Sequence, residues 1–254
     1  MDILKVILLA VEQGITELLP ISSSAHLILS SQILNIKMDT YLLSVLHLGT
    51  TMALLIYFAP ILFKDIFKKS SINFYLKILI STLPAALIGF FFESTIENSL
   101  RGNEVIAISL VFWGIIMILV ERNKKVDEQD LREVTWKQSL LMGIGQTIAL
   151  IPGSSRSGTS AIIGVLAGLN KYTAIQYSFL LGLPLLVAAP IYTIIKDAPE
   201  RTLNISDLIG IVVAFIFTFL SLALLKRFSK DRWLTFFGIY RIILGIVVLL
   251  TILF

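Results

Sequence analysis

Uncharged, largely apolar runs divide this chain. Eight stretches contain no Asp, Glu, Lys or Arg: 40–63, 78–92, 105–120, 138–155, 157–170, 172–195, 208–225 and 242–254. A soluble fold would have to bury all of these runs in one core, and a chain of 254 residues cannot do so. Apolar runs near the length of a bilayer-spanning helix are typical of membrane segments. The pattern therefore predicts an integral membrane protein with several spans.

Six segments fit complete crossings of a bilayer. A crossing needs about 20 residues of helix, and Lys, Arg, Tyr and Trp at the ends can reach toward the interface. On this basis we expect transmembrane helices over 41–59, 78–92, 104–120, 173–195, 207–225 and 234–254.

Two further regions, 1–31 and 139–170, each consist of two short apolar stretches with a break between them. The breaks read ELLPISSSAH and ALIPGSSRSG, and each holds a proline and a group of hydroxyl side chains. Apolar pieces of 10–14 residues favour re-entrant segments over spans. Backbone can be irregular at membrane depth only where protein or water satisfies its polar groups. We therefore expect two helical hairpins that enter the bilayer and turn back.

The two halves of the chain resemble each other at an offset of 132 residues. The matched pairs are Leu18 with Leu150, Leu19 with Ile151, Pro20 with Pro152, Ser22 with Ser154 and Ser23 with Ser155. Three predicted spans follow each break in the same order, and an odd number of crossings inverts the second half. The predicted fold is an all-α membrane domain over 1–254 with an inverted-topology repeat. The first repeat covers 1–120, a charged cytoplasmic linker 121–138, and the second repeat 139–254.

Composition and charge agree with this picture. Charged residues make up 15% of the chain, against about 25% in soluble domains. The net charge of +4 comes from basic loops, so it indicates cytoplasmic loops under the positive-inside rule and not nucleic-acid binding. We place 60–77, 121–138 and 226–232 in the cytoplasm, and 93–103 and 196–206 outside. The chain has no cysteine, which excludes thiolate metal sites and disulfides.

The first break carries an acidic residue at membrane depth. Gln13 and Glu17 are four residues apart and share one helix face, whereas Glu12 lies off that face. A carboxylate there costs about 2.5–3.5 kcal/mol or more. Glu17 therefore needs an Arg, a His or a divalent metal ion beside it.

Two histidines differ in their surroundings. His26 follows Ser22, Ser23 and Ser24, and a histidine beside hydroxyls suits general acid or base chemistry. His47 lies in an apolar span, so we expect it to be a hydrogen-bonded structural residue.

The second break carries a fixed positive charge. Arg156 separates the uncharged runs 138–155 and 157–170, and a guanidinium binds phosphate or carboxylate through a bidentate fork. Gly153 and Gly158 allow close backbone approach. A helix start capped by serines is a ready anion site. The residues expected to form it are Ser154, Ser155, Ser157 and Thr159.

Three functions fit these features. An enzyme that transfers the phosphoryl group of a lipid would use the Arg, the helix starts and the hydroxyls together. A transporter or flippase for a polyprenyl phosphate or another anion would use the same Arg and helix ends, without needing Ser23 or a metal ion. A structural or channel protein would hold Glu17 and Arg156 only as a buried ion pair, which leaves the hydroxyls unexplained.

The two motifs resemble the signature regions of the undecaprenyl-diphosphatase family, the bacitracin-resistance phosphatases. The residues that carry the resemblance are Gln13-x-x-x-Glu17, Leu-Pro-x-Ser-Ser-x-x-His26 and Pro152-Gly-x-Ser-Arg-Ser-Gly, together with the stretch His47-Leu-Gly-Thr. The resemblance covers essentially the whole chain. Two positions depart from the family: Gln13 stands where Glu is frequent, and Ser24-Ala25 where Thr-Gly is common.

The resemblance implies an enzyme that hydrolyses a C55 polyprenyl diphosphate to the monophosphate and inorganic phosphate, which recycles a lipid carrier for cell-wall or glycan synthesis. It implies a divalent cation, Mg²⁺ or Ca²⁺, with Glu17 as the metal-binding residue. Glu17, Ser23, His26 and Arg156 become the expected catalytic residues, with Ser23, His26 or water as the attacking group. Gln13, Ser22, Ser24 and the residues of the second motif become the expected substrate-binding set.

The resemblance also implies where the enzyme works. We expect a multi-pass protein of the plasma membrane whose active site faces outside. Its partners are the lipid substrate and membrane lipids, and members of the family can form homodimers.

Overall fold

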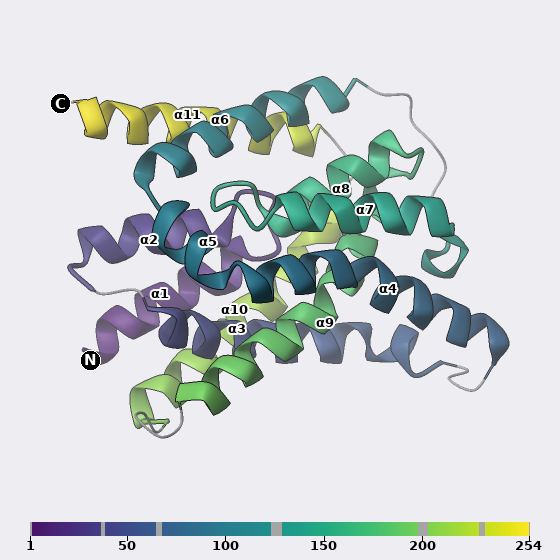
Figure 1. Ribbon diagram of the computed structural model, residues 1–254, viewed down its shortest axis with the longest axis horizontal. Coiled ribbons are helices and arrows are strands. Elements are labelled where there is room, and N and C mark those ends of the chain that lie inside the picture. The colour runs from purple at the N-terminus through teal and green to yellow at the C-terminus, as the bar shows by residue number, and fades with distance from the viewer. Residues whose placement is uncertain are drawn as a thin grey trace.

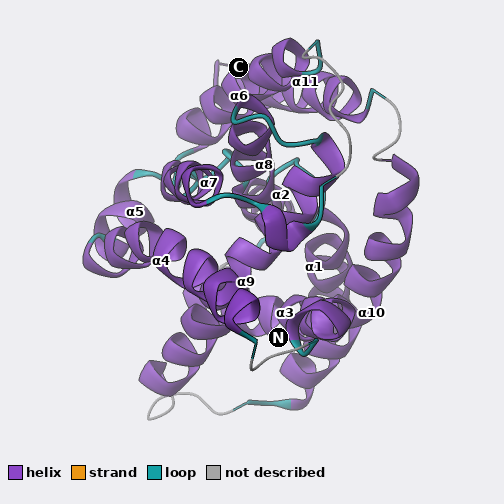
Figure 2. Cartoon of the chain, turned by 90° about the vertical axis from the view of Figure 1, so that its right-hand side faces the viewer, coloured by secondary structure: helices purple, strands orange, loops and turns teal. Residues whose placement is uncertain are grey.

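The computed structural model describes residues 2–36, 39–64, 68–122, 129–197, 203–228 and 232–253. The described residues form α-helices and one short 3-10 helix, with no strand among them (Figures 1 and 2). The helices are α1 (Ile3–Thr16), α2 (Ser23–Ile33), α3 (Thr40–Leu62), α4 (Lys69–Phe91), α5 (Glu93–Ser99), α6 (Asn103–Val120), α7 (Trp136–Ile148), α8 (Arg156–Leu166), α9 (Lys171–Asp197), α10 (Ile205–Phe228) and α11 (Trp233–Leu253). Parts of the predicted loops, at 65–67, 123–128, 198–202 and 229–231, lie outside the described residues.

Six of these helices are long and apolar enough to cross a membrane, as predicted. They are α3, α4, α6, α9, α10 and α11. The chain is therefore a multi-pass membrane protein. The candidate span in α4 begins at Ser71, seven residues before the predicted start. The prediction stopped short because of Lys77, whose amine is buried and donates hydrogen bonds to the carbonyls of Arg132 and Val134. The predicted external loop 93–103 also contains a helix, α5.

The remaining helices form two pairs at the two breaks. In the first pair α1 contacts α2, and in the second α7 contacts α8. These four helices have 14, 11, 13 and 11 residues, which is less than the length of about 20 residues that a crossing needs. We call residues 17–22 the first loop and residues 149–155 the second loop. Each loop joins the two helices of its pair.

The long helices pack around these pairs. Helices α6 and α11 lie side by side along one edge of the molecule (Figure 1), and α10 contacts both α1 and α3. Helix α9 contacts α3 and α8, and α4 contacts α7. The largest cluster of buried apolar side chains draws on α3, α4, α6 to α9 and α11. The short helices of the second pair are therefore inside the bundle.

Interior prolines and hydroxyls are matched across helices. Pro190 in α9 has no N–H, so the carbonyl of Leu186 loses its helical partner. The Thr51 hydroxyl of α3 donates a hydrogen bond to that carbonyl at 2.9 Å. A freed backbone group inside a membrane protein needs such a partner, and this bond ties α3 to α9 beside the site described below.

Glycines bring helices into close contact. A Cβ at Gly49 of α3 would lie 2.2 Å from the carbonyl oxygen of Ile211 in α10. Gly114 of α6 and Gly238 of α11 face each other in the same way, each 2.7 Å from the other's carbonyl oxygen by the same measure. Small residues at helix interfaces let membrane helices pack closely.

We expect Gly49→Ala to destabilise the fold. The new methyl group would meet backbone that cannot move independently of α10, and overpacking of this kind costs about 1–3 kcal/mol. The midpoint of thermal unfolding in detergent should fall. Gly89→Ala in α4 is the matched control, since its Cβ would come no closer than 3.6 Å to Leu150. A Gly49→Ala midpoint equal to that of the control would contradict the close packing of α3 on α10.

Candidate active site

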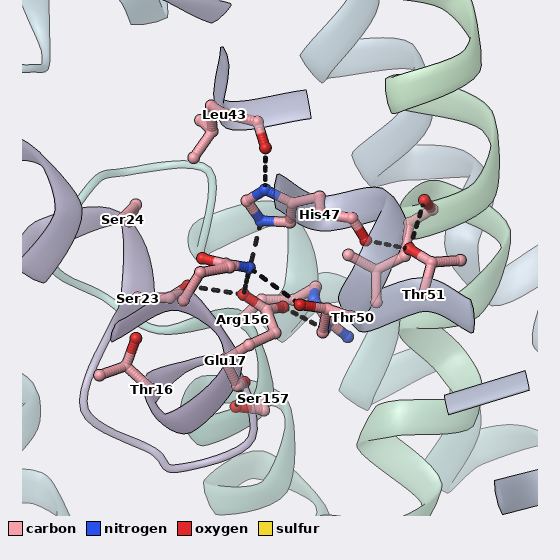
Figure 3. A network of polar contacts seen from close by, with 12 residues as sticks. Thr16, Glu17, Ser23, Ser24, Leu43, His47, Thr50, Thr51, Arg156 and Ser157 are labelled. Atoms are coloured by element: carbon pink, nitrogen blue, oxygen red, sulfur yellow. Dashed lines mark hydrogen bonds and ion pairs between the residues drawn. The ribbon is translucent and has the colours of Figure 1, made fainter. Parts of the chain in front are cut away.

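The two loops meet at one carboxylate. Glu17 follows α1 and is 6% exposed. Its Oε1 accepts a hydrogen bond from Arg156 Nη2 at 2.8 Å, and its Oε2 accepts one from Ser23 Oγ at 2.6 Å (Figure 3). Ser23 is the first residue of α2 and Arg156 the first residue of α8. The starts of these two helices therefore converge on Glu17, and the predicted cation beside it is confirmed as Arg156.

Three more side chains complete this cluster. Gln13 Nε2 lies 3.2 Å from Glu17 Oε2 and 3.5 Å from Thr50 Oγ1, which confirms that Gln13 and Glu17 share a face of α1. His47 Nε2 lies 3.4 Å from the same Glu17 oxygen. We call Gln13, Glu17, Ser23, His47, Thr50 and Arg156 the polar centre (Figure 3).

The position of His47 differs from the sequence prediction. His47 was expected to be an ordinary structural residue of an apolar span, yet it faces the carboxylate of the site. Its Nδ1 lies 2.7 Å from the Leu43 carbonyl, four residues earlier in α3. A carbonyl only accepts, so Nδ1 carries a proton and Nε2 is directed at Glu17. The sequence holds one usable signal: a lone carboxylate needs partners, and His47 is one of two histidines.

The turns that start α2 and α8 have unusual backbone geometry. Ser22 and Ser155 are the N-caps, with φ of 74° and 68°. Their hydroxyls accept hydrogen bonds from the amides of Ala25 and Gly158. Positive φ is uncommon for residues other than glycine, and each such residue stores about 1–3 kcal/mol of strain, which is typical of functional sites.

These caps also correct the register of the sequence match. The matched prolines are 132 residues apart, but the two N-caps, Ser22 and Ser155, are 133 apart. The second loop has one more residue than the first, and it contains Gly153 at φ +90°. A Cβ at Gly153 would lie 2.7 Å from the Ile106 carbonyl oxygen. Ser22 therefore corresponds to Ser155, and Ser23 to Arg156.

The other residues of the second motif serve the loops in different ways. Ser157 donates a hydrogen bond to the backbone carbonyl of Glu17 at 3.4 Å, and Thr159 donates one to the Ser154 carbonyl at 3.0 Å. A Cβ at Gly158 would be 3.0 Å from Pro20, so the predicted close approach there is confirmed. The Ser154 hydroxyl is buried and has no partner among the described residues.

A second arginine holds both loops, and the sequence analysis did not identify it. Arg241 of α11 is fully buried. Its Nη1 donates to the Pro20 carbonyl at 3.0 Å, and its Nη2 donates to the carbonyls of Gly153 and Ser154 at 2.6 and 3.1 Å. The available signal was a charge inside the apolar span 234–254. Since carbonyl oxygens and not a carboxylate accept these bonds, the positive charge of Arg241 adds to that of Arg156.

His26 lies on the other side of the first loop. Its Nδ1 is 2.8 Å from the Ser22 carbonyl and its Nε2 is 2.7 Å from the Tyr240 hydroxyl. Ser24 Oγ lies 3.2 Å from Ser22 Oγ. Both ring nitrogens of His26 are thus occupied away from Ser23, and the group that faces the Ser23 hydroxyl is Glu17.

The polar centre offers few ligands to a metal ion. The described residues contain no group of three or more His, Asp or Glu that could hold one. Gln13 Oε1 is nevertheless buried without a partner, beside the Glu17 carboxylate. Oxygen ligands suit Mg²⁺ and Ca²⁺, and Mg²⁺ is usually held by one or two carboxylates together with substrate phosphates. Glu17 and Gln13 therefore fit an ion shared with a phosphate ligand, and not a site made by the protein alone.

Comparison with known proteins agrees with this geometry. Residues 6–247 match the family model described as "Bacitracin resistance protein BacA". Undecaprenyl-diphosphatase 2 of Pseudoalteromonas translucida is 37% identical, covering 98% of both chains. Undecaprenyl-diphosphatase 1 of Clostridioides difficile is 36% identical over 98% of this chain and 96% of its own, and undecaprenyl-diphosphatase of Methanococcus aeolicus is 35% identical over 98% of both. The chain therefore belongs to the bacitracin resistance protein BacA family.

Proposed function

We propose that this protein is an undecaprenyl-diphosphatase, which hydrolyses undecaprenyl diphosphate to the monophosphate and inorganic phosphate and so recycles the lipid carrier. The relatives that carry this name match nearly the full length of the chain. The observation that carries the proposal is the convergence of Ser23 and Arg156 on Glu17, inside a membrane protein. This arrangement places a hydroxyl, a base and a phosphate-binding cation together.

The diphosphate would bind between the starts of α2 and α8. Arg156 offers a guanidinium fork to the phosphate oxygens, and the free amides of two helix starts favour an anion. The charge of Arg241 behind the loops adds to the same field. The remaining predicted ligand set follows these helix starts: Gln13, Ser22, Ser24, Gly153, Ser154, Ser155, Ser157, Gly158 and Thr159.

Ser23 is the proposed nucleophile. Its oxygen would attack the terminal phosphorus, and the bond from that phosphorus to the bridging oxygen would break, releasing undecaprenyl monophosphate. The hydroxyl proton would pass to Glu17, 2.6 Å away. Water would then attack the phosphoserine and release inorganic phosphate, returning the proton to Ser23. A direct attack by water is the alternative. A divalent cation held by Glu17 and Gln13, Mg²⁺ or Ca²⁺, would neutralise charge on the phosphates.

We further propose that the chain is an inverted repeat, with repeats over 1–120 and 139–254 and a cytoplasmic linker over 121–138. The helix pairs α1–α2 and α7–α8 would be the re-entrant hairpins. The contacts support this arrangement: α1 packs against α10 and α7 against α4, the exchange that a two-fold repeat requires. Both loops would then meet near the midplane of the bilayer.

The same proposal places the protein in the plasma membrane. The basic loops would be cytoplasmic, the active site would open outward, and the lipid tail would lie between the helices. A homodimer would be compatible with the apolar outer faces, which carry many exposed Leu, Ile and Phe side chains.

Phosphate release by the purified protein tests the function. We expect release from a C55 polyprenyl diphosphate in detergent with Mg²⁺, and its loss in EDTA. Ser23→Ala should lower the rate at least about 10²-fold, because both the attacking oxygen and its contact with Glu17 are removed. Ser24→Ala is the matched control, since Ser24 bonds to Ser22 and not to Glu17. If the lipid binds but is never cleaved, the protein is a transporter and Ser23 is only the start of a helix.

A further inference from the structure

The last helix contributes a side chain that bonds to His26. Tyr240 of α11 places its hydroxyl 2.7 Å from His26 Nε2. The two rings are nearly parallel, with an interplanar angle of 8° and centroids 5.7 Å apart. The two residues are far apart in the sequence and belong to different halves of the chain. Neither signature motif includes Tyr240.

The partners of the two ring nitrogens determine the tautomer of His26. Nδ1 faces the Ser22 carbonyl, which can only accept a hydrogen bond, so Nδ1 carries the proton. Nε2 of the neutral ring then has a lone pair and accepts from the Tyr240 hydroxyl. The hydrogen bond at one nitrogen sets the state of the other. Tyr240 is the donor that makes this tautomer the favourable one.

The Ser22 carbonyl is a sensitive point of the site. It accepts from His26 twice, from the ring Nδ1 at 2.8 Å and from the backbone amide at 3.2 Å. Ser22 has a φ of 74°, a strained value for serine. Ser23, the next residue, donates to Glu17 at 2.6 Å. The ring of His26 therefore holds the peptide unit that precedes Ser23.

We propose that Tyr240 is a positioning residue of the active site. By donating to Nε2 it fixes His26 in the Nδ1-protonated tautomer, and the ring in turn holds the Ser22 carbonyl and keeps Ser23 directed at Glu17. In this arrangement His26 supports the first loop, and Glu17 receives the proton of Ser23. The kinetic consequence rests on the proposed function, whereas the tautomer does not.

Nitrogen NMR tests the tautomer directly, because the chain has only two histidines. The probe is protein with ¹⁵N-labelled imidazoles, and His47→Gln leaves His26 as its only histidine signal. We expect the proton of wild-type His26 on Nδ1. In Tyr240→Phe we expect this signal to shift to a mixture of both tautomers. Tyr192→Phe is the matched control, with 44% exposure against 39% for Tyr240. An Nε2-protonated His26 in the wild type, or an unchanged tautomer in Tyr240→Phe, would overturn the proposal.

The kinetic arm separates positioning from general stability. We expect Tyr240→Phe to lower kcat about tenfold to 10²-fold, the scale of a small misplacement of a reacting group, with KM within twofold because Arg156 still binds the diphosphate. In a His26→Ala background the same change should cost nothing further. An equal loss in both backgrounds would show that Tyr240 does not act through His26. If the wild type releases no phosphate, the proposed function fails while the NMR result still decides the tautomer.

Discussion

Arg156→Ala is expected to lower phosphate release at least about 10³-fold. An arginine that stabilises the charge of a transferred phosphoryl group contributes 10³–10⁵ in rate, and Arg156 is the only guanidinium among the described residues that contacts Glu17. Arg156→Lys keeps the charge but loses the fork, so we expect an intermediate loss. Arg232→Ala, at an exposed position before α11, is the control and should retain full activity. The measurement is phosphate release from C55 polyprenyl diphosphate in detergent.

Stability must be separated from chemistry in this test. Removing Arg156 leaves the buried Glu17 without its closest cation, and breaking a buried pair costs about 3–5 kcal/mol. The double variant Arg156→Ala with Glu17→Gln removes both charges. We expect it to regain most of the lost thermal stability but none of the activity. Activity in either variant that carries Arg156→Ala would contradict the assignment of this site.

The sequence predicts those parts of the molecule that depend on neighbouring residues. The uncharged runs locate all six spans, because a bilayer requires the same apolar composition along each one. The pairing of Glu17 with Arg156 is also predictable, since each is an expensive charge at membrane depth that needs a partner. The boundary of α4 is not, because the partner of Lys77 is backbone in the segment after α6, more than 50 residues away.

The supporting residues of the site could not be predicted for a related reason. His47, Tyr240 and Arg241 each lie in a long apolar helix, and each reaches the site only through the packing of that helix. The carbonyls that Arg241 holds carry no signal in the sequence, because every residue has one. The shift in register from 132 to 133 arises in the strained turn around Gly153, where backbone angles decide and residue identities do not.

Glu17→Gln is expected to separate binding from turnover. The amide keeps the shape of the side chain but can neither accept the Ser23 proton nor neutralise Arg156. We expect phosphate release to fall at least about 10³-fold. The positive charges of Arg156 and Arg241 then act on the ligand with less opposition. Two charges 4 Å apart interact by about 4 kcal/mol at an effective dielectric constant of 20. Inorganic pyrophosphate measured in EDTA should therefore bind at least about tenfold more tightly.

Glu12→Gln is the matched control for this charge effect. It removes the same charge from the neighbouring residue of α1, whose carboxylate accepts a hydrogen bond from Ser30 and not from Ser23 or Arg156. It should leave both turnover and pyrophosphate affinity within a few-fold of the wild type. With Mg²⁺ present, the gain in affinity of Glu17→Gln should disappear, because the proposed cation loses its carboxylate. Weaker pyrophosphate binding by Glu17→Gln in EDTA would show that Glu17 does not oppose the anion, and that Arg156 is committed to a structural ion pair.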